Sequence, residues 1–411
     1  MLARRLKVAA VRSCDCGIQG PENLILLLAE RLRESRVDHL IVNLWDGQPP
    51  HVALHAEATR RGLASEVVAT GWDYDPSVVG KLRRLLQQEH VDLVHTYGAK
   101  AEVVSLLARA GLGIPLVGSY FGCFPVWPLR AQLAEATSLV SLRFFRRVLA
   151  NSRTLRDELV RFGFPRRRID VIPSFVDTVE VRPSTAEERK TARVCLGLPA
   201  EAPVLIQLAR LHPEKGHRYM VEAMPRVLEA HPGTVYVVAG EGWLMEELGR
   251  LAVGLGIADQ VRFLGYWPDR LEVLKAADVM VVPSRREGMS VGLLEGMATG
   301  LPIVATRVHG STEAISDGTA GLLVPPGDSA ALAGAVIRLL DDRSRMRSMG
   351  AAARQTAEAR FSADRVGRDI MRSYEVALGL RPRGTGPEAD LDAAGERRVE
   401  SGVASDDQTE W

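Results

Sequence analysis

The sequence predicts an α/β protein built from two similar parallel-sheet domains. Short β-rich segments alternate with longer amphipathic segments from the start of the chain, as in βαβ units. The same alternation begins again after a charged, proline-containing stretch between Pro183 and Pro203. A chain of 411 residues, of which 46% are hydrophobic and 25% charged, is also too long for one ordinary core. These observations together favour two domains joined near that stretch.

Each half of the chain contains its own set of strands and helices. In the first half the predicted strands are residues 6–11, 38–44, 65–70, 91–97 and 115–120, and the predicted helices are residues 22–35, 54–63 and 77–90. In the second half the predicted strands are residues 204–210, 234–240, 261–266 and 279–284, and the predicted helices are residues 217–231, 245–256 and 270–278. Strands that alternate with helices in this way are typical of a parallel sheet.

We therefore expect a first domain at residues 1–182 and a second at residues 183–360. The C-terminal third, from residue 331 through residue 378, is expected to be helical. The last helix, within residues 361–380, is expected to pack back toward the first domain. Residues 381–411 are rich in Gly, Pro and charge and poor in apolar side chains, so they are expected to be disordered.

Composition narrows the class of protein. With a formal net charge of +1, the chain has no overall positive electrostatic potential that would attract nucleic acid. Cys14, Cys16, Cys123 and Cys195 fit neither a disulfide framework nor the usual zinc patterns, so a cytoplasmic location is expected. The apolar run at the N-terminus is cut short by Arg12 and reads as a strand rather than a signal peptide. No run approaches the length of a membrane span.

Two cations follow the first strand of the second half. Arg210 and Lys215, in "LARLHPEKGH", lie in the loop at the carboxyl end of that strand. In doubly wound sheets ligands bind outside the carboxyl ends of the strands, so these cations are placed to hold a phosphate. Arg offers a planar fork to phosphate oxygens and Lys a compact charge. A solvated basic loop is the alternative.

Two carboxylates follow another strand of the same half, in "SRREGMSVGLLEGMATGLP". The pattern predicts a helix from about Ser290 to Thr299, which puts Glu287 in the loop and Glu295 on the helix. Backbone N–H groups from Gly288 to Leu293 form an anion site at the start of that helix. A buried carboxylate needs a partner, and a polyol such as ribose would supply one. The alternative is that each Glu pairs with a nearby Arg, such as Arg285 or Arg286.

From about Leu149 to Pro325 the sequence resembles the retaining glycosyltransferases of family 4, which have the GT-B fold of two Rossmann-like domains facing across a cleft. The matching motifs are "ANSRTL", "GFPRRRIDVIPSFVD", "LARLHPEKGH", "VVAGEG", "VRFLGY", "EGMSVGLLEGMA" and "GLPIVATRVHGSTEAI". The resemblance implies a metal-independent enzyme without a cofactor. Its donor would be a UDP- or GDP-sugar, and its acceptor a glycan, a lipid-linked molecule or a small molecule.

The resemblance also implies residue roles. Arg210 and Lys215 would neutralise the donor diphosphate, Glu287 would bind hydroxyls of the transferred sugar, and Glu295 would bind the ribose. Further donor contacts would come from Gly20, from the backbone of Gly288, Met289, Ser290 and Val291, and from the Arg262 and Phe263 pair. The Gly310 to Glu313 stretch, which follows another strand, would close the same sheet edge. The base would lie against Arg262 and Phe263.

The first half departs from the family. Gln19 stands where the loop before Gly20 usually has a second Gly, and Phe121 with Gly122 stands where many relatives have a His-Gly pair. Phe121, Gly122, His95 and Tyr97 are the candidates for the acceptor side, although a histidine at a strand end is also a common structural residue. A nucleotide-sugar-binding protein without transferase activity and a nucleotide-sugar epimerase of related fold are therefore the alternative functions.

A basic segment gives a further open choice. Residues 130–156 carry several arginines, among them Arg143, Arg146, Arg147, Arg153 and Arg156. They would contact anionic lipid at the inner face of the membrane or a phosphorylated acceptor, or they would form a solvated helix face. The sequence leaves the oligomeric state open.

Overall fold

The computed structural model describes residues 5–13, 17–18, 20–47, 52–71, 75–122, 129–267 and 269–380, and the predicted disordered tail lies outside them. Thirteen strands are present in these residues. Those of the first half are β1 (Leu6–Ser13), β2 (Val37–Trp45), β3 (Ala64–Ala69), β4 (Leu93–Tyr97), β5 (Leu116–Tyr120), β6 (Arg147–Ala150) and β7 (Ile169–Val171). Those of the second half are β8 (Val204–Leu208), β9 (Val235–Ala239), β10 (Val261–Gly265), β11 (Val279–Val282), β12 (Ile303–Thr306) and β13 (Leu322–Val324).

Helices connect these strands. The first half contains α1 (Gly20–Glu34), α2 (Ala53–Arg60), α3 (Ser77–Gln88), α4 (Ala99–Ala108), α5 (Leu129–Leu142) and α6 (Arg153–Arg161). The second half contains α7 (Ala186–Cys195), α8 (His217–Ala230), α9 (Met245–Gly254), α10 (Arg270–Ala276), α11 (Val291–Ala298), α12 (His309–Ala314) and α13 (Ser329–Leu340). Two long helices, α14 (Arg343–Phe361) and α15 (Ala363–Ala377), complete the described chain.

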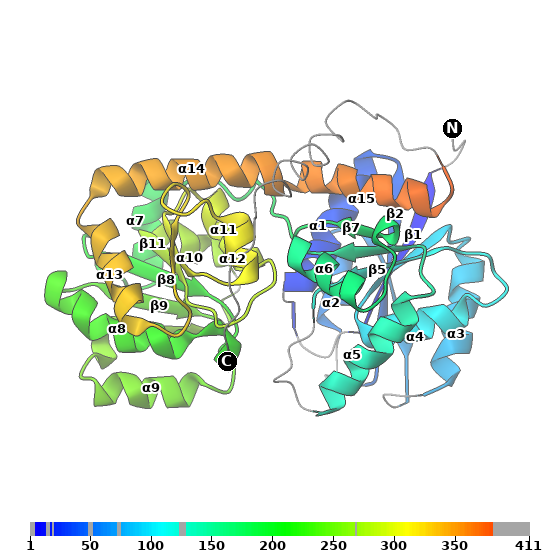
Figure 1. The fold of residues 1–411 in the computed structure, drawn as a ribbon, viewed down its shortest axis with the longest axis horizontal. Helices are drawn as coiled ribbons and strands as arrows, with labels where there is room; N and C mark the ends of the chain where they lie inside the picture. Colours follow the sequence, from blue (N-terminus) through cyan, green and yellow to red (C-terminus); the bar gives the residue numbers. More distant parts are fainter. Residues whose placement is uncertain are drawn as a thin grey trace, which may run out of the picture.

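The strands form two separate parallel sheets. The first sheet has the order β3-β2-β1-β4-β5-β6-β7 and the second has the order β10-β9-β8-β11-β12-β13. In both sheets the order reverses beside the first strand of the half, so each sheet has a switch point, at β1/β4 and at β8/β11. Ligands in such sheets bind at this point, outside the carboxyl ends of the strands. Figure 1 shows the two units side by side.

One helix lies where a connection between the domains was predicted. The stretch between Pro183 and Pro203 was predicted as the join between the domains, but residues 186–195 form α7, which packs against α10 of the second unit. Thr185 begins the helix with a complete capping box to Glu188. The Arg193 guanidinium is buried and bonded to Asp278 and to the carbonyl of Ala276. A charged sequence here is thus the outer layer of a domain.

The chain crosses between the units at two adjacent places. Val176 donates its N–H to the carbonyl of Phe361, and Ala363 donates its N–H to the carbonyl of Val176, each at 2.9 Å. As a result α14 lies over the second unit and α15 lies over the first (Figure 1). The Tyr374 side chain of α15 is fully buried against the first sheet.

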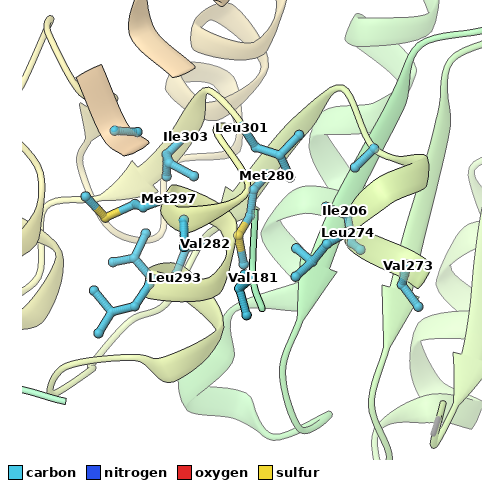
Figure 2. Close-up of a cluster of buried hydrophobic side chains, with 14 of the residues drawn as sticks. Val181, Ile206, Val273, Leu274, Met280, Val282, Leu293, Met297, Leu301 and Ile303 are labelled. Atoms are coloured by element: carbon cyan, nitrogen blue, oxygen red, sulfur yellow. The ribbon is translucent and has the colours of Figure 1, made fainter. Parts of the chain in front are cut away.

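A buried apolar core fixes α11, the helix that carries Glu295. Leu293 and Met297 of α11 pack against Met280 and Val282 of β11 (Figure 2). The packing is tight because Gly296 faces Met280: a side-chain carbon on Gly296 would lie 2.0 Å from the Met280 sulfur. The position of α11 against β11 is therefore determined by van der Waals contact.

Candidate active site

The loop after β8 brings its cation to the end of β11. Gly216 has φ +66°, and a side-chain carbon there would lie 1.9 Å from the carbonyl oxygen of Pro283, so only Gly permits this approach. The Gln207 side chain also donates to the carbonyl of Lys215 at 2.8 Å. Lys215 is thereby held beside the loop that follows β11.

Lys215 and Glu287 are in direct contact. The Lys215 ammonium lies 2.7 Å from Oε1 and 2.6 Å from Oε2 of Glu287, and the Ser284 hydroxyl donates to Oε2 at 3.1 Å. Both charged side chains are largely buried. The sequence predicts that these two residues lie at one sheet edge. In the structure they are within hydrogen-bonding distance of each other.

Arg210 lies in the same loop but is more exposed. Its guanidinium is 3.5 Å from the buried carboxylate of Glu214, and the backbone carbonyl of Glu214 accepts from the N–H of Arg285 at 2.7 Å. Glu214 therefore ties the β8 loop to the β11 loop. His217, at the start of α8, is buried, and burial together with the Lys215 charge lowers its pKa to about 3, so it is neutral.

The predicted helix is present almost as expected. Ser290 caps α11 by accepting from the N–H of Leu293 at 3.4 Å, and Gly300 follows the helix with φ +73°. Glu295 is 5% exposed, and burial raises its pKa. Its partner is Arg270 at the start of α10, 3.2 Å from Oε1, which opposes that rise. The partner is an arginine, as the alternative interpretation required, but neither Arg285 nor Arg286.

The carboxyl edge of the first sheet meets this loop from the other side. A side-chain carbon on Gly20, the first residue of α1, would lie 3.5 Å from Cγ2 of Val291. Gly288 faces the side chain of Asn151, which follows β6, and the Ser174 hydroxyl donates to the carbonyl of Met289 at 2.9 Å. The backbone from Gly288 to Val291 thus lies between the two sheet edges. Gln19, the departure beside Gly20, lies outside the described residues.

Three of the four candidate acceptor-side residues line a cavity of about 30 Å³ in the first unit. His95, Tyr97, Phe121 and Asn151 contribute to its wall. His95 is buried, its Nδ1 is 2.7 Å from the Tyr374 hydroxyl, and its Nε2 is 2.9 Å from the Ser119 hydroxyl. Burial lowers the pKa of His95 to about 3. This neutral, fully bonded histidine connects α15 to β4, while its predicted acceptor-side role stays a prediction.

The remaining predicted residues are Gly122, Arg262 and Phe263. Gly122 has φ +93° beside Leu155. Arg262 and Phe263 lie on β10, the edge strand of the second sheet, where Arg262 is exposed and Phe263 is half-buried. Their backbone pairs with Val237 and Val238 of β9. Among the described residues, no three His, Cys, Asp or Glu side chains are arranged to hold a metal ion.

Sequence reasoning missed four contacts. Arg270 reaches Glu295 from another helix, and Asn151 and Ser174 reach the Gly288 to Val291 stretch from the other unit. Glu313 was considered only as part of a closing loop, yet its carboxylate accepts from the N–H groups of Arg153 and Thr154 at 3.0 and 3.2 Å. All of these pairs join residues far apart in sequence, and the motifs themselves carry no signal for the pairing.

Comparison with known proteins identifies the family. A model described as Glycosyltransferase Family 4 matches residues 18–180, and one described as Glycosyl transferases group 1 matches residues 202–342. A D-inositol 3-phosphate glycosyltransferase of Acidothermus cellulolyticus is 34% identical over 354 residues, which are 82% of this chain and 74% of that protein.

The chain belongs to glycosyltransferase family 4.

Other relatives of this glycosyltransferase agree. A GDP-mannose-dependent monoacylated alpha-(1-6)-phosphatidylinositol monomannoside mannosyltransferase of Corynebacterium glutamicum is 27% identical over 350 residues, 82% of this chain and 75% of that protein. The structure of Anabaena HepE in complex with UDP and glucose superimposes with a TM-score of 0.80 at 20% identity, covering 90% of this chain and all of that one. At that identity the likeness shows the fold, which is GT-B. The family, the fold and the enzyme class predicted from the sequence are confirmed. Within the described residues, none of the helices has the length and apolar composition that crossing a membrane requires.

Proposed function

We propose that this enzyme transfers a sugar with retention, and without a metal, from a UDP- or GDP-sugar to a glycan, lipid-linked or small-molecule acceptor in the cytoplasm. One juxtaposition carries the proposal: Lys215, Arg210, the α11 N-terminus, Glu287 and Glu295 share one sheet edge, and Gly20 of the other unit faces it. Names of relatives that use GDP-mannose or bind UDP are consistent with such a donor.

In this proposal the diphosphate lies between the α11 N-terminus and Lys215. Helix N-termini favour anions because their N–H groups are unsatisfied and point outward. An ammonium has three donors, so Lys215 can keep its contact with Glu287 while donating to a phosphate oxygen. Glu287 then lies beside the transferred sugar, where it accepts from sugar hydroxyls, and Glu295 accepts from the ribose.

The mechanism assigned to the protein is electrostatic. In front-face transfer the departing phosphate takes the acceptor's proton, so the protein must stabilise negative charge that develops on the diphosphate. Lys215 and Arg210 are the groups placed to do so. Removing one preorganised donor of this kind costs on the order of 3 kcal/mol, about a hundredfold in rate.

The test measures binding and turnover separately. A thermal-shift screen of UDP- and GDP-sugars identifies the donor, because a ligand that binds the folded state raises the melting temperature. Hydrolysis of that donor without acceptor is then measured. We expect Arg210→Ala to lower the rate about a hundredfold with little change in melting temperature, and Lys190→Ala, an exposed lysine of α7, to have no effect. Lys215→Ala should lower the rate by a similar factor and also lower the melting temperature, because it leaves the largely buried Glu287 carboxylate without its partner. Full activity with both residues replaced would overturn the donor-site assignment.

The same experiment separates the alternatives. A nucleotide-sugar-binding protein would raise its melting temperature with donor but would not hydrolyse it. An epimerase would convert the donor sugar to its epimer with the nucleotide still attached. A nucleotide-sugar-binding protein would also place cations against the diphosphate, so hydrolysis of the donor without acceptor is the measurement that separates it from a transferase.

The proposal includes a contact with anionic membrane surfaces. Apolar and basic side chains are exposed on α5, on α6 and in the connections that follow these two helices, which we call the α5–α6 surface: Leu133, Val140, Phe144 and Phe162 with Arg143, Arg146, Arg161, Arg166, Arg167 and Arg168. Arg143 joins its parts, since its guanidinium donates to the carbonyl of Phe162 at 2.5 Å and its carbonyl accepts from Arg168 at 3.3 Å. Apolar side chains interspersed with arginines fit an interface of anionic headgroups.

Vesicle co-sedimentation tests this contact. The protein should sediment with phosphatidylcholine vesicles that contain phosphatidylglycerol, less so at high salt, and Phe144→Ser with Phe162→Ser should abolish the binding. Val253→Ser, an exposed valine on α9, is the control. Absence of sedimentation with anionic vesicles at low salt would contradict the membrane contact and leave a phosphorylated acceptor or a solvated face.

A further inference from the structure

Glu295 is a buried carboxylate whose charge has to be maintained for it to bind a ribose. A carboxylate that accepts hydrogen bonds from two hydroxyls must be ionised, and burial opposes ionisation. Glu295 is 5% exposed on α11 and packs beside the apolar core of the second unit. The question is which group keeps it ionised.

Arg270 is the charged group in contact with it. Its Nη2 lies 3.2 Å from Oε1 of Glu295, and its own side chain is 43% exposed. The shortest contact of the ion pair is to Oε1, and it joins a nearly buried carboxylate to a partly exposed guanidinium. A guanidinium also carries five N–H donors, so one contact does not exhaust it.

The position of Arg270 is fixed by its surroundings. Asp269 caps α10 by accepting from the N–H groups of Leu271 and Glu272 at 3.0 and 3.2 Å. The Trp267 indole donates to the Glu272 carboxylate at 2.9 Å and packs on the core that also holds α11. The connection from β10 into α10 is thus anchored on both sides of Arg270.

We propose that Arg270 is a positioning residue for the donor nucleotide: it holds the Glu295 carboxylate ionised and oriented so that this carboxylate accepts from the ribose hydroxyls. The inference rests on the ribose role given to Glu295 in the proposed function. It adds a residue that the family motifs do not contain, because Arg270 lies outside the two-glutamate element and reaches it only through the packing of α10 on the second sheet.

The proposal makes ribose recognition depend on pH when Arg270 is removed. Burial raises the pKa of Glu295, Arg270 lowers it, and, among the residues that the structure describes, the charge of Glu180 in the connecting segment also raises it. Without Arg270 the carboxyl takes up a proton at a higher pH. A protonated carboxyl accepts fewer hydrogen bonds, so nucleotide affinity falls as the pH falls, beginning at a higher pH than in the wild type.

The experiment measures the dissociation constants of UDP and GDP by titration calorimetry from pH 8.5 to 5.5, for wild type, Arg270→Ala and Arg270→Lys. Phosphate protonation affects all three proteins equally and cancels in the ratio to wild type. For the nucleotide that binds, Arg270→Ala should weaken binding about tenfold near neutral pH, as expected for one charge-assisted contact, and the ratio should grow as the pH falls. Arg270→Lys should restore part of the affinity.

Two controls separate positioning from general structure. Arg250→Ala removes an exposed arginine that pairs with Glu246 on α9 and should change nothing. The 2′-deoxy nucleotide should bind wild type more weakly than its parent, and Arg270→Ala should lose this discrimination, which a merely structural role would leave intact.

Failure of this inference differs from failure of the proposed function. If Glu295→Gln weakens nucleotide binding while Arg270→Ala binds as wild type at every pH and still discriminates against the 2′-deoxy nucleotide, the role of Arg270 is overturned and that of Glu295 stands. If Glu295→Gln itself leaves the affinity unchanged, the ribose assignment falls.

Discussion

Lys215 and Glu287 form an ion pair, so their proposed roles are not independent. Both Glu287 oxygens lie within 2.7 Å of the Lys215 ammonium, and the Ser284 hydroxyl adds a third contact. A lysine held in this way has lost most of its side-chain freedom before a phosphate arrives, so less entropy is lost on binding. In the proposed donor complex, the same contact would orient Glu287 toward the transferred sugar. Replacing either residue therefore disturbs the other.

Gly310 shows how a single residue without a side chain shapes this loop. A side-chain carbon on Gly310 would lie 1.4 Å from the carbonyl oxygen of Gly288, and the Gly310 N–H donates to the carbonyl of Glu287 at 3.2 Å. The backbone of α12 is thus in contact with the backbone beside Glu287. The sequence "HGSTEA" indicated a loop closing the sheet edge, and the reason for its Gly is this close approach.

At the scale of elements, α12 of the second unit contacts the N-terminus of α6 in the first unit. The Glu313 carboxylate of α12 accepts from the N–H groups of Arg153 and Thr154 and from the Thr154 hydroxyl at 3.3 Å. These N–H groups belong to the first turn of α6, and N–H groups at that position have no acceptor within their own helix. A carboxylate supplied by another unit is a helix cap, and it stabilises the two units in contact.

Removing this cap should favour separation of the units. We expect Glu313→Ala to shift the equilibrium toward a more open arrangement by about 1 kcal/mol, roughly fivefold, which raises the radius of gyration in small-angle X-ray scattering and raises KM for the donor. Glu313→Gln keeps an acceptor oxygen and should show a smaller effect. Identical scattering curves and KM values for Glu313→Ala and wild type would refute this role.

What the sequence can predict follows the range of the interactions. The nine strands β1–β5 and β8–β11, the α11 helix and the presence of Lys215 and Glu287 at one edge depend on local patterns and on the sheet rule, so they were predicted correctly. The partner of Glu295 depends on how α10 packs, and α7 was hidden because its charged face resembles a linker. Its capping box, Thr185 with Glu188, was the available signal.

At the scale of the whole molecule, the join between the first unit and the C-terminal helix is a buried group of rings. His95 bonds to Tyr374 of α15 and to Ser119, and the His39 ring lies 6.4 Å from the Tyr374 ring. Burial lowers the pKa of His39 to about 4 and that of His95 to about 3. Both rings are therefore neutral where an unfolded chain would begin to protonate them.

This arrangement predicts loss of stability in mild acid. Above pH 6.5 neither state is protonated at these histidines and they contribute no pH dependence. As the pH falls below 6.5 the unfolded state binds protons that the folded state excludes, which lowers the free energy of unfolding by up to about 1.4 kcal/mol per pH unit for each histidine until the folded pKa is reached. Glu102 acts in the opposite direction, since burial raises its pKa to about 7 and its ionisation destabilises the fold as the pH rises.

The variant His39→Leu isolates one of these contributions, because the difference from wild type cancels all groups that the two proteins share. Neither ring nitrogen of His39 has a hydrogen-bond partner within the described residues, so Leu removes the titration without breaking a bond. Urea unfolding at pH 7.5, 6.5, 5.5 and 4.5 should give a free energy of unfolding for His39→Leu at least equal to that of wild type at pH 7.5. Below pH 6.5 the gap should widen in favour of the variant by up to about 1.4 kcal/mol per pH unit. A gap that stays constant from pH 7.5 to pH 4.5 would mean that His39 protonates alike in both states and that α15 is docked on a wetter surface than its burial indicates.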